Sequence, residues 1–216
     1  MNIKETVVCL AAGILVLTVG TAAVQRNAQW KSATCTANLK TLHQAMFAYA
    51  NDHDNAIVPV AYEIRPRWTF WHDYIRKYLK EPRVLYCPAN PRAEKQFADD
   101  DDDLVASAID QMSISYGMNY ALGATVKAGS QPSRDYRFAN VKNPEHVVCI
   151  GDAKSLNPRL RGTKYCWKED YAPIHEEKTL IVFVDGHVEA MDKENLGMMD
   201  AFDGWKQDKS RWVSWK

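Results

Sequence analysis

The first fifty residues carry two hydrophobic patterns in succession. The first is an uncharged, mostly apolar run of 18 residues, from Val7 to Val24. An α-helix rises ~1.5 Å per residue and the hydrocarbon core of a bilayer is ~30 Å thick, so a run of this length can cross it. In the second pattern, apolar residues recur at steps of four and three, which places them on one helical face. They are Cys35, Leu39, Leu42, Met46 and Tyr49.

No proline or glycine separates the two patterns, so we predict one continuous helix from the apolar run into the following domain. The helix should end near residues 51–55, where Asn and Asp side chains favour turns and Pro59 follows. Two interpretations of the apolar run remain open. It is either a retained membrane anchor or a secretory signal peptide cut near Thr21-Ala22-Ala23. In both cases the rest of the chain is exported.

The remaining chain predicts short strands after the helices. Residues 68–79 have the spacing of a second helix, and residues 83–88 read as a short strand stopped by Pro88. Further extended segments are expected at 113–120 and 146–151, with Asp152 after the second. Apolar runs at 180–184 and 187–190 flank Asp185-Gly186, which predicts a hairpin with a two-residue turn and positive φ at both positions. The order of helix followed by antiparallel strands indicates an α+β fold.

Charge and cysteine content narrow the function. Lys plus Arg and Asp plus Glu number 27 each, and a chain of zero net charge does not suit a nucleic-acid partner. Cys9 lies in the apolar run, and the other four cysteines allow three pairings in an exported domain.

The five acidic residues 99–103 are typical of a solvated loop. A calcium site there is the alternative, although calcium loops usually alternate ligands with spacers.

Several short motifs occur in a fixed order along the chain. They are Cys35-Thr-Ala-Asn38-Leu39-Lys40, Tyr49-Ala-Asn-Asp52, Trp71-x-x-Tyr-Ile-x-x-Tyr78-Leu79, Cys87-Pro88, Ser115-Tyr-Gly-Met-Asn119, and His175 followed after nine residues by Asp185-Gly186. This series resembles the bacterial type IV pilin and pseudopilin-like proteins, which have a prepilin-type N-terminal helix and a C-terminal His-x9-Asp-Gly motif. The processing motif is degenerate here, because Met1-Asn-Ile-Lys-Glu5 replaces the usual Phe-Thr-Leu-Ile-Glu.

The resemblance implies a pilin-like fold, in which a long N-terminal helix packs on a small antiparallel sheet with a C-terminal hairpin. The expected organisation is an N-terminal flank (1–6), an apolar half-helix (7–24) and an exported domain (25–216). The implied function is that of a non-enzymatic subunit of a type II secretion or type IV pilus-like assembly. It would be a single-pass inner-membrane protein with its body in the periplasm or outside the cell, and its partners would be other pilin-like subunits or secretion and pilus components, not nucleic acid.

The resemblance also assigns roles to single residues. Glu5 would act in assembly, since in pilins this carboxylate pairs with the terminal amine of a neighbouring subunit and an unpaired charge in lipid is costly. Cys35 and Cys87 accompany the landmark motifs and are the preferred disulfide. The remaining motif residues are expected to be structural: Asn38, Pro88, Asn119, His175, Asp185 and Gly186.

One cluster offers a different interpretation. Asp152, His175, Asp185 and His187 could together bind zinc or a similar metal, or carry catalysis. In that case the protein is an anchored or secreted enzyme or carbohydrate-binding domain that uses the His175 and Asp185 region. The turn already accounts for Asp185, so we expect neither a metal nor another cofactor, and no catalytic residue.

Overall fold

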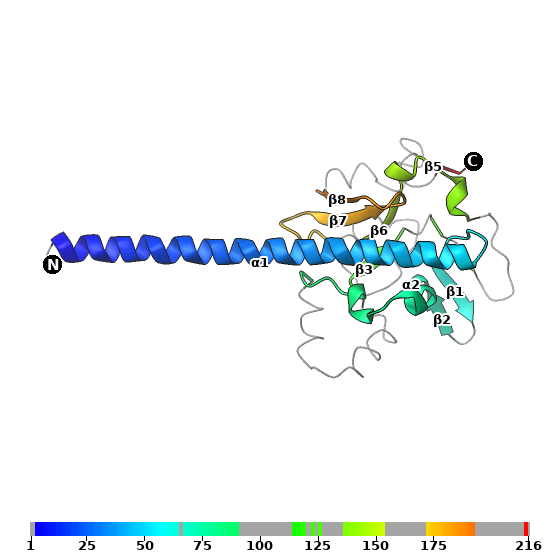
Figure 1. Ribbon diagram of the computed structural model, residues 1–216, viewed down its shortest axis with the longest axis horizontal. Coiled ribbons are helices and arrows are strands. Elements are labelled where there is room, and N and C mark those ends of the chain that lie inside the picture. The colour runs from blue at the N-terminus through cyan, green and yellow to red at the C-terminus, as the bar shows by residue number, and fades with distance from the viewer. Residues whose placement is uncertain are drawn as a thin grey trace.

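A single long helix organises the protein in the computed structural model. The structure describes residues 3–64, 67–90, 114–119, 122–123, 125–126, 136–153, 172–192 and 214–215. Within these ranges, side chains are described from residue 21 onward, except at positions 22, 61–64, 67–68, 125–126 and 214–215. Helix α1 (Ile3–Asp52) has 50 residues and confirms the predicted continuous helix. Its C-terminal half lies within the body and its N-terminal half extends away from it (Figure 1).

The helix ends where the sequence predicts. Asn55 donates its backbone N–H to the carbonyl of Ala50 at 2.8 Å, and Asp54 and Asn55 have positive φ angles of 50° and 64°. Asn and Asp tolerate this left-handed conformation better than most residues, and it commonly terminates helices. Among the residues whose side chains are described, no helix is long and apolar enough to cross a membrane.

The main sheet has four antiparallel strands in the order β3-β6-β7-β8. These are β3 (Tyr116–Met118), β6 (Val148–Asp152), β7 (Thr179–Phe183) and β8 (Val188–Met191). The central strands β6 and β7 are buried along their whole length, and α1 packs against both. Helix and antiparallel sheet together confirm the predicted α+β class.

Smaller elements complete the body. Strands β1 (Ala61–Ile64), β2 (Arg67–Phe70) and β4 (Thr125–Val126) form a second sheet, and β5 (Val141–Lys142) pairs with β9 (Ser214–Trp215). Helix α2 (Trp71–Ile75) continues into the 3-10 helix η1 (Arg76–Tyr78). Three further 3-10 helices are η2 (Pro82–Leu85), η3 (Phe138–Asn140) and η4 (Pro144–His146). Of these elements, β1, β2 and α2 lie on the other side of α1 from the main sheet (Figure 1).

Two predicted elements are corrected. The second helix begins at Trp71 instead of residue 68, because residues 67–70 pair with β1, and Asp73 accepts a hydrogen bond from the N–H of Phe70 at 2.8 Å. The predicted strand at 83–88 is wrong. Pro82 stands in the first turn of η2, a position that suits its fixed φ, and the N–H of Tyr86 bonds the carbonyl of Arg83.

The C-terminal hairpin is confirmed, but its turn differs from the prediction. Phe183 donates its N–H to the carbonyl of His187 at 2.9 Å, and Gly186 donates to the carbonyl of Phe183 at 3.0 Å. Gly186 has a φ of 92°, whereas Asp185 is not among the residues with positive φ. The loop is therefore a three-residue turn closed by a left-handed glycine, which is a common alternative to the two-residue hairpin turn.

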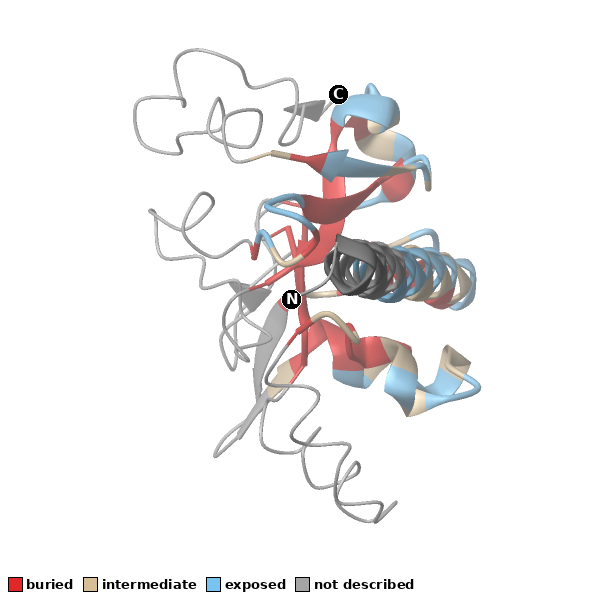
Figure 2. Cartoon of the chain, turned by 90° about the vertical axis from the view of Figure 1, so that its left-hand side faces the viewer, coloured by how far each residue is buried: buried red, intermediate tan, exposed pale blue. Residues whose placement is uncertain are grey.

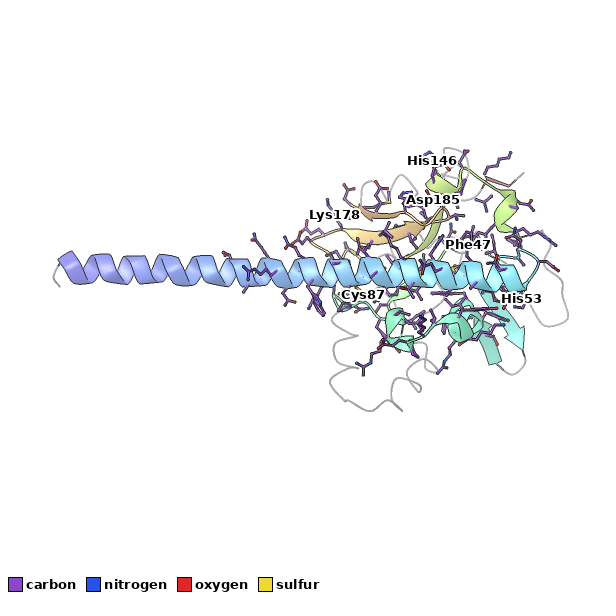
Figure 3. The ribbon with its side chains drawn as sticks, in the orientation of Figure 1. Phe47, His53, Cys87, His146, Lys178 and Asp185 are labelled. Carbon is purple, nitrogen blue, oxygen red and sulfur yellow. A yellow bond between two sulfur atoms is a disulfide. The ribbon has the colours of Figure 1, made fainter. Side chains whose placement is uncertain are left out.

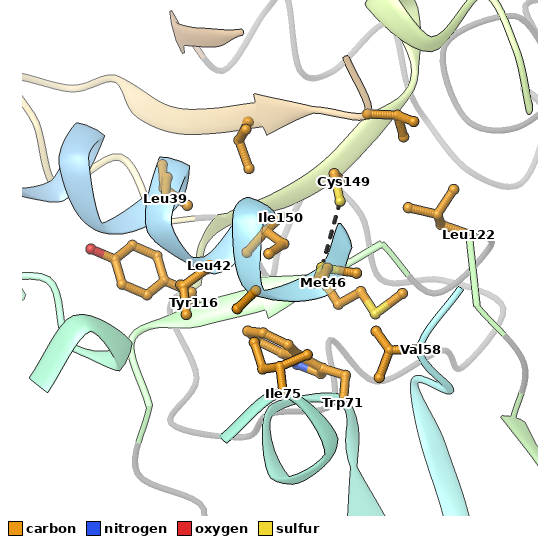
Figure 4. Packing of buried hydrophobic residues seen from close by; sticks show 14 of the residues in the cluster. Leu39, Leu42, Met46, Val58, Trp71, Ile75, Tyr116, Leu122, Cys149 and Ile150 are labelled. Carbon is orange, nitrogen blue, oxygen red and sulfur yellow. Dashed lines mark hydrogen bonds between the residues drawn. The ribbon is translucent and has the colours of Figure 1, made fainter. Parts of the chain in front are cut away.

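The predicted apolar face of α1 forms the centre of one core. Cys35, Leu39, Leu42 and Met46 are fully buried, and Tyr49 is 9% exposed. Figure 4 shows this face between the sheet and α2, with Met46 close to Cys149, Trp71 and Val58. Viewed along α1, buried segments lie on one side of the helix while its other side is exposed (Figure 2). One core thus joins the helix to both parts of the body.

Candidate functional site

A disulfide joins α1 to the segment after η2. Cys35 and Cys87 are bonded, with their Cα atoms 5.3 Å apart, which confirms the preferred pairing. Cys149 is a buried free thiol whose Sγ lies 3.7 Å from the Sδ of Met46, and Cys166 lies outside the described residues. Figure 3 shows Cys87 directly beside α1. The disulfide therefore fixes the first buried turn of the helix to the body.

His175 lies at the centre of a polar network around this disulfide. Its Nδ1 is 3.0 Å from the Oγ of Ser32 on α1. Its Nε2 is 3.2 Å from the Sγ of Cys87 and 3.3 Å from the Oδ2 of Asp152 at the end of β6. The side chains of His175 and Asp152 are 4% and 0% exposed, respectively. Four segments that are distant in the sequence therefore meet at one imidazole ring.

The backbone holds His175 in place through a tight turn. The N–H groups and carbonyls of His175 and Lys178 bond each other at 3.0 and 2.9 Å, and β7 begins at the next residue. Between them, Glu176 and Glu177 have positive φ angles of 51° and 66°. Two successive positive φ angles are typical of a turn that favours Asn-Gly, so this conformation is costly for glutamate. The surrounding structure thus imposes the position of His175.

Asp152 is an unusual buried carboxylate. Its Oδ2 accepts a hydrogen bond from the N–H of Leu180 at 2.9 Å, whereas its Oδ1 has no partner among the described residues. Burial raises the pKa of the Asp152 carboxyl above its ordinary value, and the contacts with His175 and the Leu180 N–H oppose this rise. The carboxylate therefore has unused capacity to accept a hydrogen bond or a cation.

The order Ser32, His175 and Asp152 has the connectivity of a hydrolytic triad, but the setting does not suit that chemistry. Ser32 lies in the middle of α1, where backbone N–H groups donate to carbonyls four residues earlier. An acyl-transfer site needs free N–H donors beside the nucleophile for the developing oxyanion. The buried imidazole is also covered by Cys87 on the side of Nε2. The network is consequently better suited to holding the four segments together.

The residues of the alternative cluster occupy two separate places. Asp152 and His175 contact each other at the end of β7 where the strand begins. Asp185 and His187 follow the other end of β7 and contact each other, with 2.6 Å between the Oδ1 of Asp185 and the Nδ1 of His187. Figure 3 shows Lys178 and Asp185 at opposite ends of the hairpin. The His-x9-Asp-Gly motif therefore spans β7, with one end at the disulfide and the other at the hairpin turn.

The hairpin turn makes its own contact with α1. The Nε2 of His43 donates a hydrogen bond to the carbonyl of Val184 at 2.9 Å. A Cβ atom at Gly186 would lie 2.9 Å from the Cε1 of His43, so glycine is required by space as well as by its φ of 92°. Burial lowers the pKa of His43, and the bond to Val184 and the charge of Asp185 act in the opposite direction. Both ends of β7 are thus attached to α1 through a histidine.

The two motif asparagines bond backbone carbonyls. Asn38 on α1 donates to the carbonyl of Tyr86 at 2.9 Å and lies 3.3 Å from the hydroxyl of Tyr116. Asn119 is fully buried and donates to the carbonyl of Val148 at 2.7 Å. Pro88, directly after the disulfide, is half-buried. The side chain of Glu5 and the acidic residues 99–103 lie outside the described part of the chain, so the predictions on assembly and calcium stay predictions.

Two features of the network were not predicted from the sequence. One is Ser32, which precedes Cys35 by one helical turn and therefore shares its face of α1. That spacing is a signal that could have identified it. The other is the meeting of Asp152 and His175 with the two cysteines, since nothing in the sequence brings these four residues together.

Comparison of the chain with protein-family models, curated proteins and solved structures finds no match.

Proposed function

We propose that the protein is a pilin-like structural subunit, anchored in the membrane by its N-terminal helix, that assembles with other pilin-like subunits or secretion components. The observation that carries the proposal is the continuity of α1, whose C-terminal half is built into the body while its N-terminal half extends away (Figure 1). The extending half contains the uncharged run from Val7 to Val24. Such a helix couples an apolar anchor rigidly to an exported domain.

Exposed apolar side chains at the end of the run and just beyond it support this proposal. Val24 and Trp30 are 71% and 60% exposed, and they are the large hydrophobic residues that the described part of the chain exposes most. Trp30 lies six residues beyond Val24, or about 9 Å along a helix. The headgroup region of a bilayer is about 5–7.5 Å deep on each side, so Trp30 would lie at its outer edge. Tryptophan is enriched at such interfaces because its ring is apolar and its N–H is polar.

The burial of the His175 network favours this function over an anchored enzyme. A substrate needs access to the reacting groups, whereas His175 and Asp152 are almost completely covered. The turn residues Asp185 and His187 are exposed, but they contact each other. The structural role of the network, which joins α1 to the sheet and to η2, is sufficient to account for its burial.

Anchoring is tested with membranes from cells that express the full chain. The chain should remain in the pellet after alkaline carbonate washing and enter the soluble fraction only with detergent. A central charge, as in Leu15→Arg, should reduce insertion because it costs ~3 kcal/mol on insertion scales. Leu15→Ile is the matched control and should insert normally. Release of the wild-type chain by carbonate alone would contradict the anchor.

Assembly is tested at Glu5. Glu5→Leu should reduce cross-linked oligomers or surface fibres while the chain remains in the membrane and its body remains folded. Glu5→Asp keeps the carboxylate and should retain assembly. Monomers in wild-type cells, with no co-purifying pilus or secretion components, would refute the assembly role and leave only an anchored domain.

A further inference from the structure

We propose that the reduced chain binds one zinc ion through Cys35, Cys87, Asp152 and His175, at the place where the disulfide forms in the oxidised chain. All four residues are buried, and one potential ligand atom from each lies within 4.8 Å of the other three. Two thiolates, an imidazole and a carboxylate are donors that zinc accepts in tetrahedral sites. The inference concerns the body alone and does not depend on assembly or anchoring.

The separations around His175 already fit such a site. Bonds of ~2.0–2.3 Å in a tetrahedron place neighbouring ligand atoms about 3.2–3.8 Å apart. The Nε2 of His175 lies 3.2 Å from the Sγ of Cys87 and 3.3 Å from the Oδ2 of Asp152. Reduction frees the two sulfur atoms to move apart to a similar distance, since they are then no longer bonded. Three of the four ligand groups therefore need little displacement.

Ser32 orients the imidazole for metal binding. When the Nδ1–H of His175 donates to the Oγ of Ser32, the lone pair of Nε2 points toward Cys87 and Asp152. Histidine ligands usually have such a partner on the other ring nitrogen, because it fixes both the tautomer and the ring orientation. The strained turn at Glu176 and Glu177 fixes the backbone of the same residue. Both features hold His175 in one position before a metal arrives.

The unpartnered oxygen of Asp152 is a second, independent observation that favours a cation at this place. Asp152 is fully buried, and its Oδ1 has no hydrogen-bond donor among the described residues. Leaving a buried acceptor unsatisfied costs free energy. A zinc ion bound by both carboxylate oxygens would satisfy Oδ1 as well as Oδ2, whereas the disulfide satisfies neither.

The two states are exclusive and are related by thiol–disulfide exchange. A dithiol reductant transfers two electrons and two protons to the Cys35–Cys87 bond, yielding two thiols, and is itself oxidised to a disulfide. Zinc then displaces one proton from each thiol to give two zinc–thiolate bonds. In either state, the covalent bond or the metal joins α1 to the segment after η2. The metal would additionally join the ends of β6 and β7 through Asp152 and His175.

The test uses the full chain in mild detergent, prepared once with a dithiol reductant under anaerobic conditions and once oxidised. Each sample is titrated with zinc in competition with a chelator of known affinity, and then with cobalt. The reduced chain should bind one equivalent of zinc, and the cobalt form should show the intense visible bands of a tetrahedral site together with sulfur-to-cobalt charge transfer. The oxidised chain should bind at least tenfold more weakly.

Variants separate the site from unspecific binding. His175→Gln and Asp152→Asn should each weaken zinc binding at least tenfold, and Ser32→Ala should weaken it by about 10–100-fold, the range found for partners of metal-bound histidines. Cys149→Ala and His187→Gln are the controls and should bind as the wild type does. Ser32 is only partly buried, so its variant keeps the test decisive if a ligand variant fails to fold.

Three results would overturn the inference. The first is a reduced chain that is folded by circular dichroism and binds no stoichiometric zinc. The second is a reduced chain that stays unfolded at every zinc concentration. The third is a zinc affinity that is equal in the oxidised and the reduced chain, or equal in the wild type and the Ser32→Ala variant.

Discussion

Gly186→Ala should destabilise the fold through two separable effects. The φ of Gly186 is 92°, and a residue with a Cβ atom is disfavoured by roughly 1–2 kcal/mol in the left-handed region. The new Cβ atom would also lie 2.9 Å from the Cε1 and 3.2 Å from the Nδ1 of His43. Contacts this short force a displacement of the imidazole, and overpacking of this kind costs about 1–3 kcal/mol. The sum is a loss of about 2–5 kcal/mol in the free energy of unfolding.

A double-mutant cycle with His43→Ala separates the two effects. Removing His43 also abolishes its 2.9 Å hydrogen bond to the carbonyl of Val184. That loss cancels, because it is present in both the single variant His43→Ala and the double variant. In the His43→Ala background, Gly186→Ala should cost only the backbone term of roughly 1–2 kcal/mol. The coupling between the two positions should therefore be about 1–3 kcal/mol.

Denaturant unfolding of the four full-length chains, with the disulfide intact, gives the required free energies. Tryptophan fluorescence and circular dichroism should report coincident transitions, which establishes that a two-state treatment applies. If Gly186→Ala costs the same with and without His43, the steric part of the reasoning is wrong. If it costs less than ~0.5 kcal/mol in both backgrounds, the backbone part is wrong as well.

Three further predictions concern other parts of the body. Replacing both Cys35 and Cys87 by alanine should lower the stability of the oxidised chain by about 4 kcal/mol, because the disulfide closes a loop with a sequence separation of 52; a loss below ~1 kcal/mol in denaturant unfolding would contradict this. Burial lowers the pKa of His72 below 6.5, so the unfolded state binds more protons just below that pH and stability should fall as the pH decreases from 6.5. The slope should reach at most about 1.4 kcal/mol per pH unit and should diminish in His72→Gln; an unchanged slope in this variant speaks against the assignment. Replacing Glu176-Glu177 by Asn-Gly should raise stability by ~1 kcal/mol, since both φ angles are positive, and a loss of stability would show that the glutamate side chains make compensating contacts.

The sequence predicted best those elements whose signals are local. The face from Cys35 to Tyr49 has helical spacing over several turns, and tertiary contacts reinforce the same pattern. The hairpin around Gly186 was predictable because apolar runs flank a turn dipeptide. Its turn type was not, since the loop is also fixed from outside by the bond between His43 and Val184, which are 141 positions apart in the sequence.

The remaining elements depend on partners that the sequence does not reveal. Residues 67–70 have the composition of either a helix start or a strand, and the pairing with β1 decides the outcome. Glu176 and Glu177 adopt positive φ against their intrinsic preference, so no propensity argument predicts that turn. The contact between Ser32 and His175 joins positions 143 residues apart, which is why the sequence names His175 as a candidate but not its partner Ser32.

The place of the disulfide has a mechanical consequence. When the two ends of the chain are pulled apart, the force on α1 first meets the contact between Ser32 and His175 and then passes from Cys35 through the sulfur–sulfur bond to Cys87. The intervening chain, including the rest of α1, then carries none of that tension. With a sequence separation of 52 and ~3.5 Å per extended residue, about 180 Å of contour length is withheld from extension. In a single-molecule stretching experiment, the oxidised chain should therefore lengthen by about 180 Å less than the reduced chain on full unfolding.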